Sequence, residues 1–211
     1  MSAITLLQLR SWNENCYRVT ACCCPGFGAT YVNPCHPYGA RAREEQTPAM
    51  LALNPLGELP VLKDGEQVLY GTQAILAHLA RVYDPSGTWL PLDPAIFGGV
   101  MQWTLFSAAP LGCAVTGPAG GAVLADRVIF EVLKASSRPA FRIMDDHMTL
   151  RQMDGCEWFA GAGPTIADLA LFPSFALSRD YGIDHDEFPA LRRWIKRFRT
   201  VAGFLDHAGH T

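Results

Sequence analysis

Hydrophobic positions follow a strand pattern over one short stretch of the chain and then change to a helical period. Residues 59–62 are apolar, Asp64-Gly65 tolerates positive φ, and residues 68–69 resume the apolar run, which predicts two antiparallel strands joined by a tight turn. Gly71 breaks the second strand, and we expect Thr72 to cap the helix that follows. Apolar residues then recur at the spacing of one buried helix face: Ala74, Ile75, Leu76, Leu79, Val82 and Tyr83.

The chain upstream of this hairpin predicts three further elements. They are a strand over residues 4–9, a helix that begins near Asn13 or Asn15 and ends at Pro25-Gly26, and a strand over residues 29–33. Residues 34–48 are turn-rich and polar, and we expect a short helix near residues 40–46. The order β-α-β-loop-β-β-α is thioredoxin-like, so the sequence predicts an α/β domain over residues 1–83.

The remaining chain is helical in pattern. Residues 84–94 are rich in proline and glycine and are expected to be a linker. Thr165 and Asp168 have the spacing of a capping box ahead of an apolar helix, which indicates a folding role for Asp168. We therefore expect an all-helical domain over residues 95–211, with a break at residues 136–139 and other helices over residues 95–108, 122–135, 140–153 and 189–200.

Composition narrows the class of protein. The 211 residues are 49% hydrophobic and 18% charged, with a net charge of −3, so nothing indicates nucleic-acid binding. Neither a signal-peptide pattern nor a membrane-length apolar run is present, and we expect a soluble cytoplasmic protein. The seven cysteines are odd in number and lack the paired spacing of a zinc site. We therefore expect reduced thiols and no metal.

The hairpin and its helix also predict a binding site. A strand that runs directly into a helix N-terminus places free backbone N–H groups beside the hairpin edge, where they and the helix dipole favour a carboxylate. Pro60 cannot donate a hydrogen bond, so the edge beside it leaves the backbone of Leu59 free for an extended peptide. These residues are typical of a site that captures a small anionic peptide by its main chain.

Two motifs resemble those of a known family. Residues 54–65 read N-P-L-G-E-L-P-V-L-K-D-G and residues 69–75 read L-Y-G-T-Q-A-I, which is similar to the glutathione-binding half of the cytosolic glutathione transferases. Residues 163–168, G-P-T-I-A-D, are similar to the capping motif of that family's helical domain. The resemblance implies a cis peptide bond before Pro60 and backbone pairing of Leu59 with glutathione. It places the glutathione site at Trp12, Asn13, Glu58, Leu59, Pro60, Gly71 and Thr72.

The chain departs from the family at one pair of positions. A Glu-Ser pair is usual where Gly71-Thr72 stands here. Thr72 can still hold the γ-glutamyl carboxylate, but Gly71 cannot supply the carboxylate that would meet the γ-glutamyl ammonium group. A charge-assisted hydrogen bond of that kind is worth roughly 1.5–3 kcal/mol. We therefore expect glutathione to bind more weakly, or other residues to complete the site.

The catalytic step needs a hydrogen-bond donor for the thiolate at a helix N-terminus. Asn13 stands at the position where the family usually has a serine, and Asn15 lies two residues further on. The side-chain amide of either residue can donate a hydrogen bond to a thiolate. Either residue can instead be the N-cap of the helix. Trp12, Trp103 and Phe106 are candidates for an apolar substrate pocket, although aromatic residues at helical spacing also occur in cores.

The resemblance thus implies a glutathione transferase that conjugates glutathione to a small hydrophobic electrophile in detoxification. It implies a homodimer with glutathione as co-substrate and no metal, nucleic acid or membrane as partner. Two alternatives remain. A transferase-like domain that no longer catalyses would serve as an interaction or scaffold module. A glutathione-dependent disulfide reductase or peroxidase would need a reactive Cys16.

Overall fold

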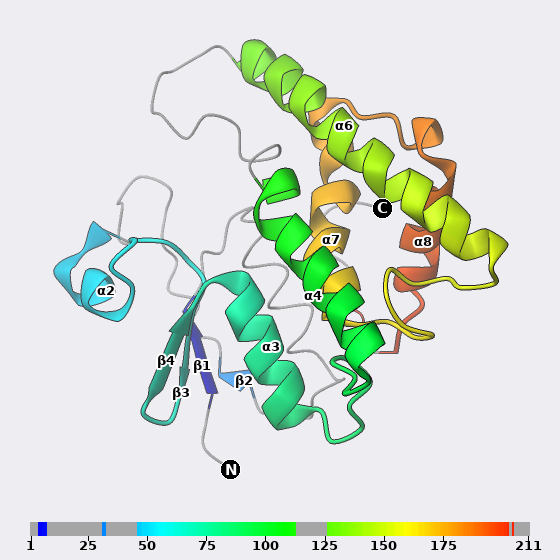
Figure 1. The fold of residues 1–211 in the computed structure, drawn as a ribbon. Helices are drawn as coiled ribbons and strands as arrows, with labels where there is room; N and C mark the ends of the chain where they lie inside the picture. Colours follow the sequence, from blue (N-terminus) through cyan, green and yellow to red (C-terminus); the bar gives the residue numbers. More distant parts are fainter. Residues whose placement is uncertain (1–3, 8–30, 33–45, 113–125, 203, 205–211) are drawn as a thin grey trace. The chain divides into compact units, whose positions relative to one another are not determined.

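The structure is a computed structural model that describes residues 4–7, 31–32, 46–112, 126–202 and 204 (Figure 1). The chain divides into two compact units, residues 1–87 with 202–211, and residues 88–201. The division falls within residues 84–94, which the sequence predicts to be a linker. In the described part of the chain, every helix is too short or too polar to span a lipid bilayer.

The first unit contains a four-stranded mixed sheet with the strand order β2-β1-β3-β4. β1 runs parallel to β2 and antiparallel to β3, and β3 runs antiparallel to β4. The strands are β1 (Ile4–Leu7), β2 (Tyr31–Val32), β3 (Val61–Asp64) and β4 (Gln67–Tyr70). Asp64 pairs with Gln67, so the predicted hairpin is confirmed and its turn is the two residues Gly65-Glu66. Gly65 has a φ of 59°, a value that favours glycine.

Two helices belong to the described part of this unit, α2 (Pro48–Leu53) and α3 (Thr72–Tyr83). α3 confirms the predicted helix, and its buried face includes Ile75, Leu76, Leu79 and Ala80. Ala74 and Val82 were expected on that face and are exposed, so this part of the prediction is wrong. Periodicity locates an apolar stripe, but only the sheet underneath decides which of its edge residues are covered.

α2 was not predicted, although Thr47-Pro48 is a helix-start signal. Thr47 Oγ accepts a hydrogen bond from Met50 N at 3.4 Å, and Pro48 occupies the first helical turn, where a missing N–H costs nothing. Met50 packs with Leu59 and Val61 in a small apolar cluster. This cluster anchors the chain on both sides of the loop that joins α2 to β3. The predicted helix between Asn13 and Pro25-Gly26 and residues 40–45 lie outside the described residues.

The second unit is helical. Its main helices are α4 (Pro94–Ala108), α6 (Asp126–Met153), α7 (Ile166–Ala176) and α8 (Pro189–Phe198), and short 3-10 turns lie at Ser178–Tyr181 and His185–Glu187. α7 lies against α4 and α8 and is buried over nearly its whole length (Figure 1). The Trp194 ring from α8 packs edge-on against Phe159 and Phe172 at centroid distances of 4.9 and 6.1 Å. This aromatic cluster forms the core of the unit.

One expected break is absent. α6 continues through Pro139, so the prediction of two helices separated at residues 136–139 is wrong. Ser137, Phe141 and Met144 are all fully buried, which means that the apolar face keeps its helical period across the proline. Burial of this face outweighs the hydrogen bond that the proline cannot make, because helices in proteins are stabilised mainly by tertiary packing.

Candidate functional site

The loop between α2 and β3 is built around Asn54, which is 2% exposed. Asn54 N donates to Met50 O at 2.8 Å and ends α2, and Asn54 O accepts from Gly57 N at 2.9 Å. Its side chain accepts from Leu56 N at 3.0 Å and donates to Glu58 O at 2.7 Å. The order Asn-Pro-Leu-Gly places each residue type where a β-turn prefers it. The backbone and side-chain polar groups of Asn54 therefore all help to hold this loop. The sequence did not predict this role.

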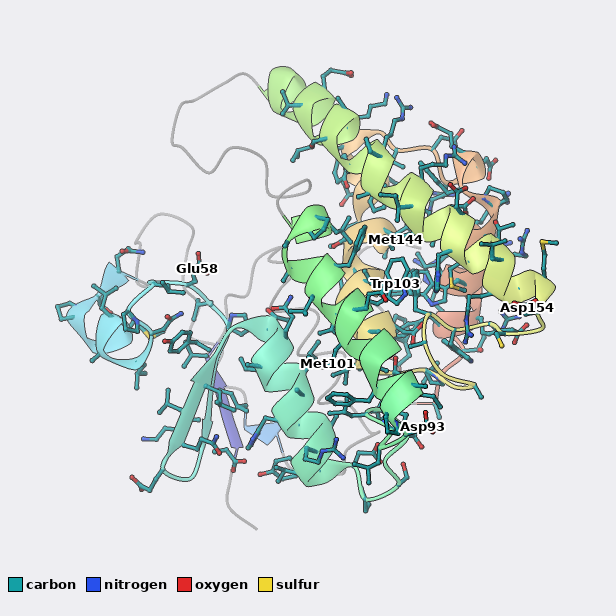
Figure 2. All side chains as sticks on the ribbon, in the orientation of Figure 1. Glu58, Asp93, Met101, Trp103, Met144 and Asp154 are labelled. Carbon is teal, nitrogen blue, oxygen red and sulfur yellow. The ribbon has the colours of Figure 1, made fainter. Side chains whose placement is uncertain are left out.

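The loop leads directly into Leu59 and Pro60, which are joined by a cis peptide bond as the resemblance implies. The Leu59 side chain is 8% exposed and packs into the Met50 cluster, and Pro60 is buried. Glu58 is exposed on the loop (Figure 2). The packed side chain of Leu59 thereby fixes the position of its backbone.

The sheet register brings Leu59-Pro60 and Gly71-Thr72 to the same end of the hairpin. Val61, the first residue of β3, pairs with Tyr70, the last residue of β4. The residues just before β3 and just after β4 therefore leave the sheet together. This places the predicted peptide-binding backbone beside the N-terminus of α3, where the backbone N–H groups and the helix dipole favour an anion.

The start of α3 differs from the prediction in one respect. Gly71, not Thr72, is the N-cap, and it makes no side-chain capping bond; Thr72 is the first helical residue and is 4% exposed. Gly71 has φ 83° and ψ 116°, a backbone conformation that residues other than glycine rarely adopt. The sequence could not reveal this backbone conformation, so the threonine was the stronger capping candidate. A Cβ at Gly71 would have no heavy atom within 4 Å.

The other end of the hairpin is fastened to α3 by a polar cluster that the sequence did not predict. His78 Nε2 lies 2.8 Å from Asp64 Oδ2, and the Tyr83 hydroxyl donates to Asp64 Oδ1 at 2.8 Å. The hydrogen bond from His78 is the main cause that lowers the pKa of Asp64, whereas burial and the bond to Asp64 raise the pKa of Tyr83. The cluster fastens the C-terminal half of α3 to the turn end of the hairpin.

Two of the three predicted pocket residues, Trp103 and Phe106, lie on α4 and differ in exposure. Trp103 is 5% exposed and packs against His147 and Phe159, with ring centroids 4.4 and 4.8 Å apart (Figure 2). Phe106 lies 5.1 Å from the Trp103 ring and is half-buried. Burial lowers the pKa of His147, whose Nε2 lies 2.9 Å from Phe159 O. Trp103 is thus a core residue, and Phe106 keeps more surface for a ligand.

Several predicted residues cannot be placed. Trp12, Asn13, Asn15 and Cys16 lie outside the described residues. Cys156 is the one cysteine within them, and it is half-buried with a free thiol. No group of three or more His, Cys, Asp or Glu residues in the described part of the chain could hold a metal ion.

The fold agrees with comparisons against known proteins. Residues 32–87 match the family described as glutathione S-transferase, N-terminal domain, and residues 129–197 match glutathione S-transferase, C-terminal domain. The two segments together make up more than half of the chain. The chain belongs to the glutathione S-transferase superfamily. This confirms the predicted thioredoxin-like domain followed by an all-helical domain.

Individual relatives are distant. Glutathione S-transferase F10 of Arabidopsis thaliana is 29% identical over 62% of this chain and 62% of its own. The trimodular acetylaranotin synthesis protein of Aspergillus terreus is 26% identical over 92% of this chain, which spans 22% of that protein. The chain therefore covers less than two thirds of either relative. A glutathione transferase homologue from Lodderomyces elongisporus, solved with two glutathione molecules per subunit, has a TM-score of 0.80 at 20% identity over 96% of both chains and shares the fold.

Proposed function

We propose that this protein is a glutathione transferase that joins the sulfur of glutathione to a small hydrophobic electrophile. The observation that carries the proposal is the position of Leu59-Pro60 beside Gly71-Thr72, at the N-terminus of α3. The Leu59 backbone would pair with the cysteinyl part of the tripeptide. The Thr72 hydroxyl and backbone N–H groups of the first turn of α3 would hold the γ-glutamyl carboxylate.

The chemistry then requires a thiolate. In the proposed reaction the side-chain amide of Asn13 or Asn15 donates a hydrogen bond to the glutathione sulfur and favours the ionised form. The thiolate sulfur forms a bond to an electrophilic carbon, and the leaving group departs with its electron pair or, in an addition, the neighbouring carbon takes a proton. Phe106, which is half-buried, stays a candidate contact for the electrophile. By family likeness we also expect a cytoplasmic homodimer.

Titration of the purified protein with reduced glutathione in a calorimeter tests the binding half of the proposal. We expect saturable binding, weakened about ten- to a hundredfold by Thr72→Ala through loss of a hydrogen bond to a charged group. Thr165→Ala is the matched control, because it removes a buried threonine hydroxyl from the other unit. No binding at millimolar glutathione would overturn the proposal and favour the scaffold alternative.

A second experiment tests the catalytic half. The thiolate of bound glutathione is followed by its ultraviolet absorbance as pH rises, in the unsubstituted protein and in Asn13→Ala, Asn15→Ala and Cys16→Ser. One asparagine variant should raise the pKa of the bound thiol toward its free value, and Cys16→Ser should not. If both asparagine variants form the thiolate normally, the proposed donor is wrong. Loss of disulfide reductase activity in Cys16→Ser would instead support the reductase alternative.

A further inference from the structure

We propose that Asn54 is a positioning residue for glutathione, which acts by holding the backbone that leads into Leu59. The inference rests on the proposed function and names a residue outside the set that would touch the ligand. Its basis is the loop at residues 54–58, which is fixed at both ends by the apolar cluster of Met50, Leu59 and Val61. Between these anchors, the loop's path depends on polar contacts.

Asn54 supplies most of those contacts. Its backbone groups end α2 through Met50 O and close the turn through Gly57 N, and its side chain reaches Leu56 N and Glu58 O. The two side-chain bonds need one acceptor and one donor, a combination that an amide has and a carboxylate or an apolar side chain lacks. The bond to Glu58 O is the more informative, because Glu58 C=O and Leu59 N–H belong to the same peptide group, which this bond therefore fixes.

A second brace acts on the same turn. Gln46 Nε2 donates to Gly57 O at 3.1 Å, and Gly57 has a φ of 63°. A Cβ at Gly57 would lie 2.3 Å from Gln46 Nε2, so this position suits glycine for two reasons. The turn is therefore held from inside by Asn54 and from outside by Gln46, and a ligand that pairs with Leu59 meets a backbone already in place. Preorganisation of this kind raises affinity because less ordering remains to be done on binding.

The chain offers a matched control in Asp84, which is also buried at 7% exposure. Asp84 Oδ1 accepts from Ser86 N at 2.9 Å, the same two-residue arrangement that Asn54 makes with Leu56. Asp84 follows the C-terminus of α3, and this 12-residue helix places it about 18 Å from Thr72. Asp84→Ala therefore removes a comparable buried contact from the same unit, but far from the site.

The test compares Asn54→Ala, Asn54→Asp and Asp84→Ala by glutathione calorimetry and by amide hydrogen exchange at Gly57. We expect Asn54→Ala to weaken glutathione binding about tenfold or more and to speed Gly57 exchange by a similar factor. Asn54→Asp keeps the acceptor for Leu56 N but sets a carboxylate oxygen against Glu58 O, so its affinity should stay near that of Asn54→Ala. Asp84→Ala should lower the unfolding midpoint and leave glutathione affinity unchanged.

Three results would overturn the inference: normal glutathione affinity in a folded Asn54→Ala, normal affinity in Asn54→Asp, or an equal loss of affinity in Asp84→Ala. If the unsubstituted protein binds no glutathione, the proposed function fails by itself. Gly57 exchange then decides the role of Asn54, and unchanged exchange in Asn54→Ala overturns it. If Asn54→Ala does not fold, Gln46→Ala loosens the same turn from outside, and faster Gly57 exchange with a severalfold weaker affinity is expected; no change in either would overturn the inference.

Discussion

Replacing Asp168 by alanine should destabilise the helical unit more than Asp145→Ala or Asp184→Ala does. Asp168 is fully buried at the start of α7. Its Oδ1 accepts from Phe159 N at 3.2 Å and Trp194 Nε1 at 2.9 Å, and its Oδ2 accepts from Thr165 N at 3.0 Å and Thr165 Oγ at 3.1 Å. One carboxylate thus joins α7 to α8 and to the segment after α6.

The size of this loss in stability follows from the hydrogen-bond donors that would lose their acceptor. Asp168→Ala leaves three buried N–H donors without their acceptor, and each unsatisfied buried donor costs about 1–3 kcal/mol. The loss is therefore at least about 3 kcal/mol, a large share of the 5–15 kcal/mol typical of a folded domain. Thr165→Ala removes one hydroxyl, which accepts from Ala167 N at 3.3 Å and donates to Asp168 Oδ2 at 3.1 Å. The loss of such a capping side chain costs about 0.5–2 kcal/mol.

Urea unfolding followed by tryptophan fluorescence measures these changes, because Trp158 and Trp194 both lie in the affected core. The control is Asp184→Ala, since Asp184 is exposed and its Oδ1 accepts from Asp186 N alone among the described hydrogen bonds, at 2.9 Å. Its loss should be below about 1 kcal/mol. The expected order of destabilisation is Asp184→Ala, then Thr165→Ala, then Asp168→Ala. A loss for Asp168→Ala no larger than that for Thr165→Ala would refute the reasoning.

Three further predictions concern Gly71, Asp145 and His185. Gly71→Ala should cost about 1–3 kcal/mol of folding stability through backbone strain alone. Gly71→Glu should carry the same cost and yet tighten glutathione binding, because it restores a carboxylate for the γ-glutamyl ammonium group. A titration that gives Gly71→Glu the same glutathione affinity as the unsubstituted protein would contradict this expected gain. Asp145→Ala should cost about 1–3 kcal/mol in urea unfolding, because Asp145 Oδ1 accepts from both N–H groups that begin α8, Ala190 N and Leu191 N, at 2.9 Å. Burial, aided by nearby Arg179, lowers the pKa of His185 to about 4 from 6.5. Because the unfolded chain then takes up the proton first, the contribution of His185 to stability should fall by about 3 kcal/mol between pH 6.5 and pH 4, and His185→Phe should lack this contribution.

The pH measurement must be read as a difference between the two proteins. Burial raises the pKa of Asp168 to about 6 from 3.8, so this carboxyl binds its proton more tightly in the folded state. Its contribution to stability is present below pH 4 and is lost as pH rises toward 6, which is opposite in sign to that of His185. Subtracting the His185→Phe curve from the wild-type curve cancels the Asp168 contribution. A flat difference between pH 4 and pH 6.5 would show that His185 is not held neutral by burial.

Local signals in the sequence were reliable where a short segment contains all the groups that interact. The hairpin turn at Gly65-Glu66 and the capping box of Thr165 and Asp168 are confirmed, since each depends on residues at most a few positions apart. The same holds for α3, whose apolar spacing is continuous. The resemblance to a family added the cis bond before Pro60, which no periodicity could have predicted.

By itself, then, the sequence determined the hairpin, most of the helices in the described part of the chain and the superfamily. It also predicted a glutathione-binding segment, which stays a prediction. Only the tertiary structure decided that α6 passes through Pro139, because the buried face that holds it there is formed by distant residues. The same is true of Gly71, whose conformation depends on how β4 meets α3, and of Val82, which the sheet leaves exposed. Asn54 is a different case, because its four hydrogen bonds all lie within residues 50–58. The sequence shows only an ordinary turn residue, and the structure was needed to show that its side chain contacts Leu56 N and Glu58 O at the same time.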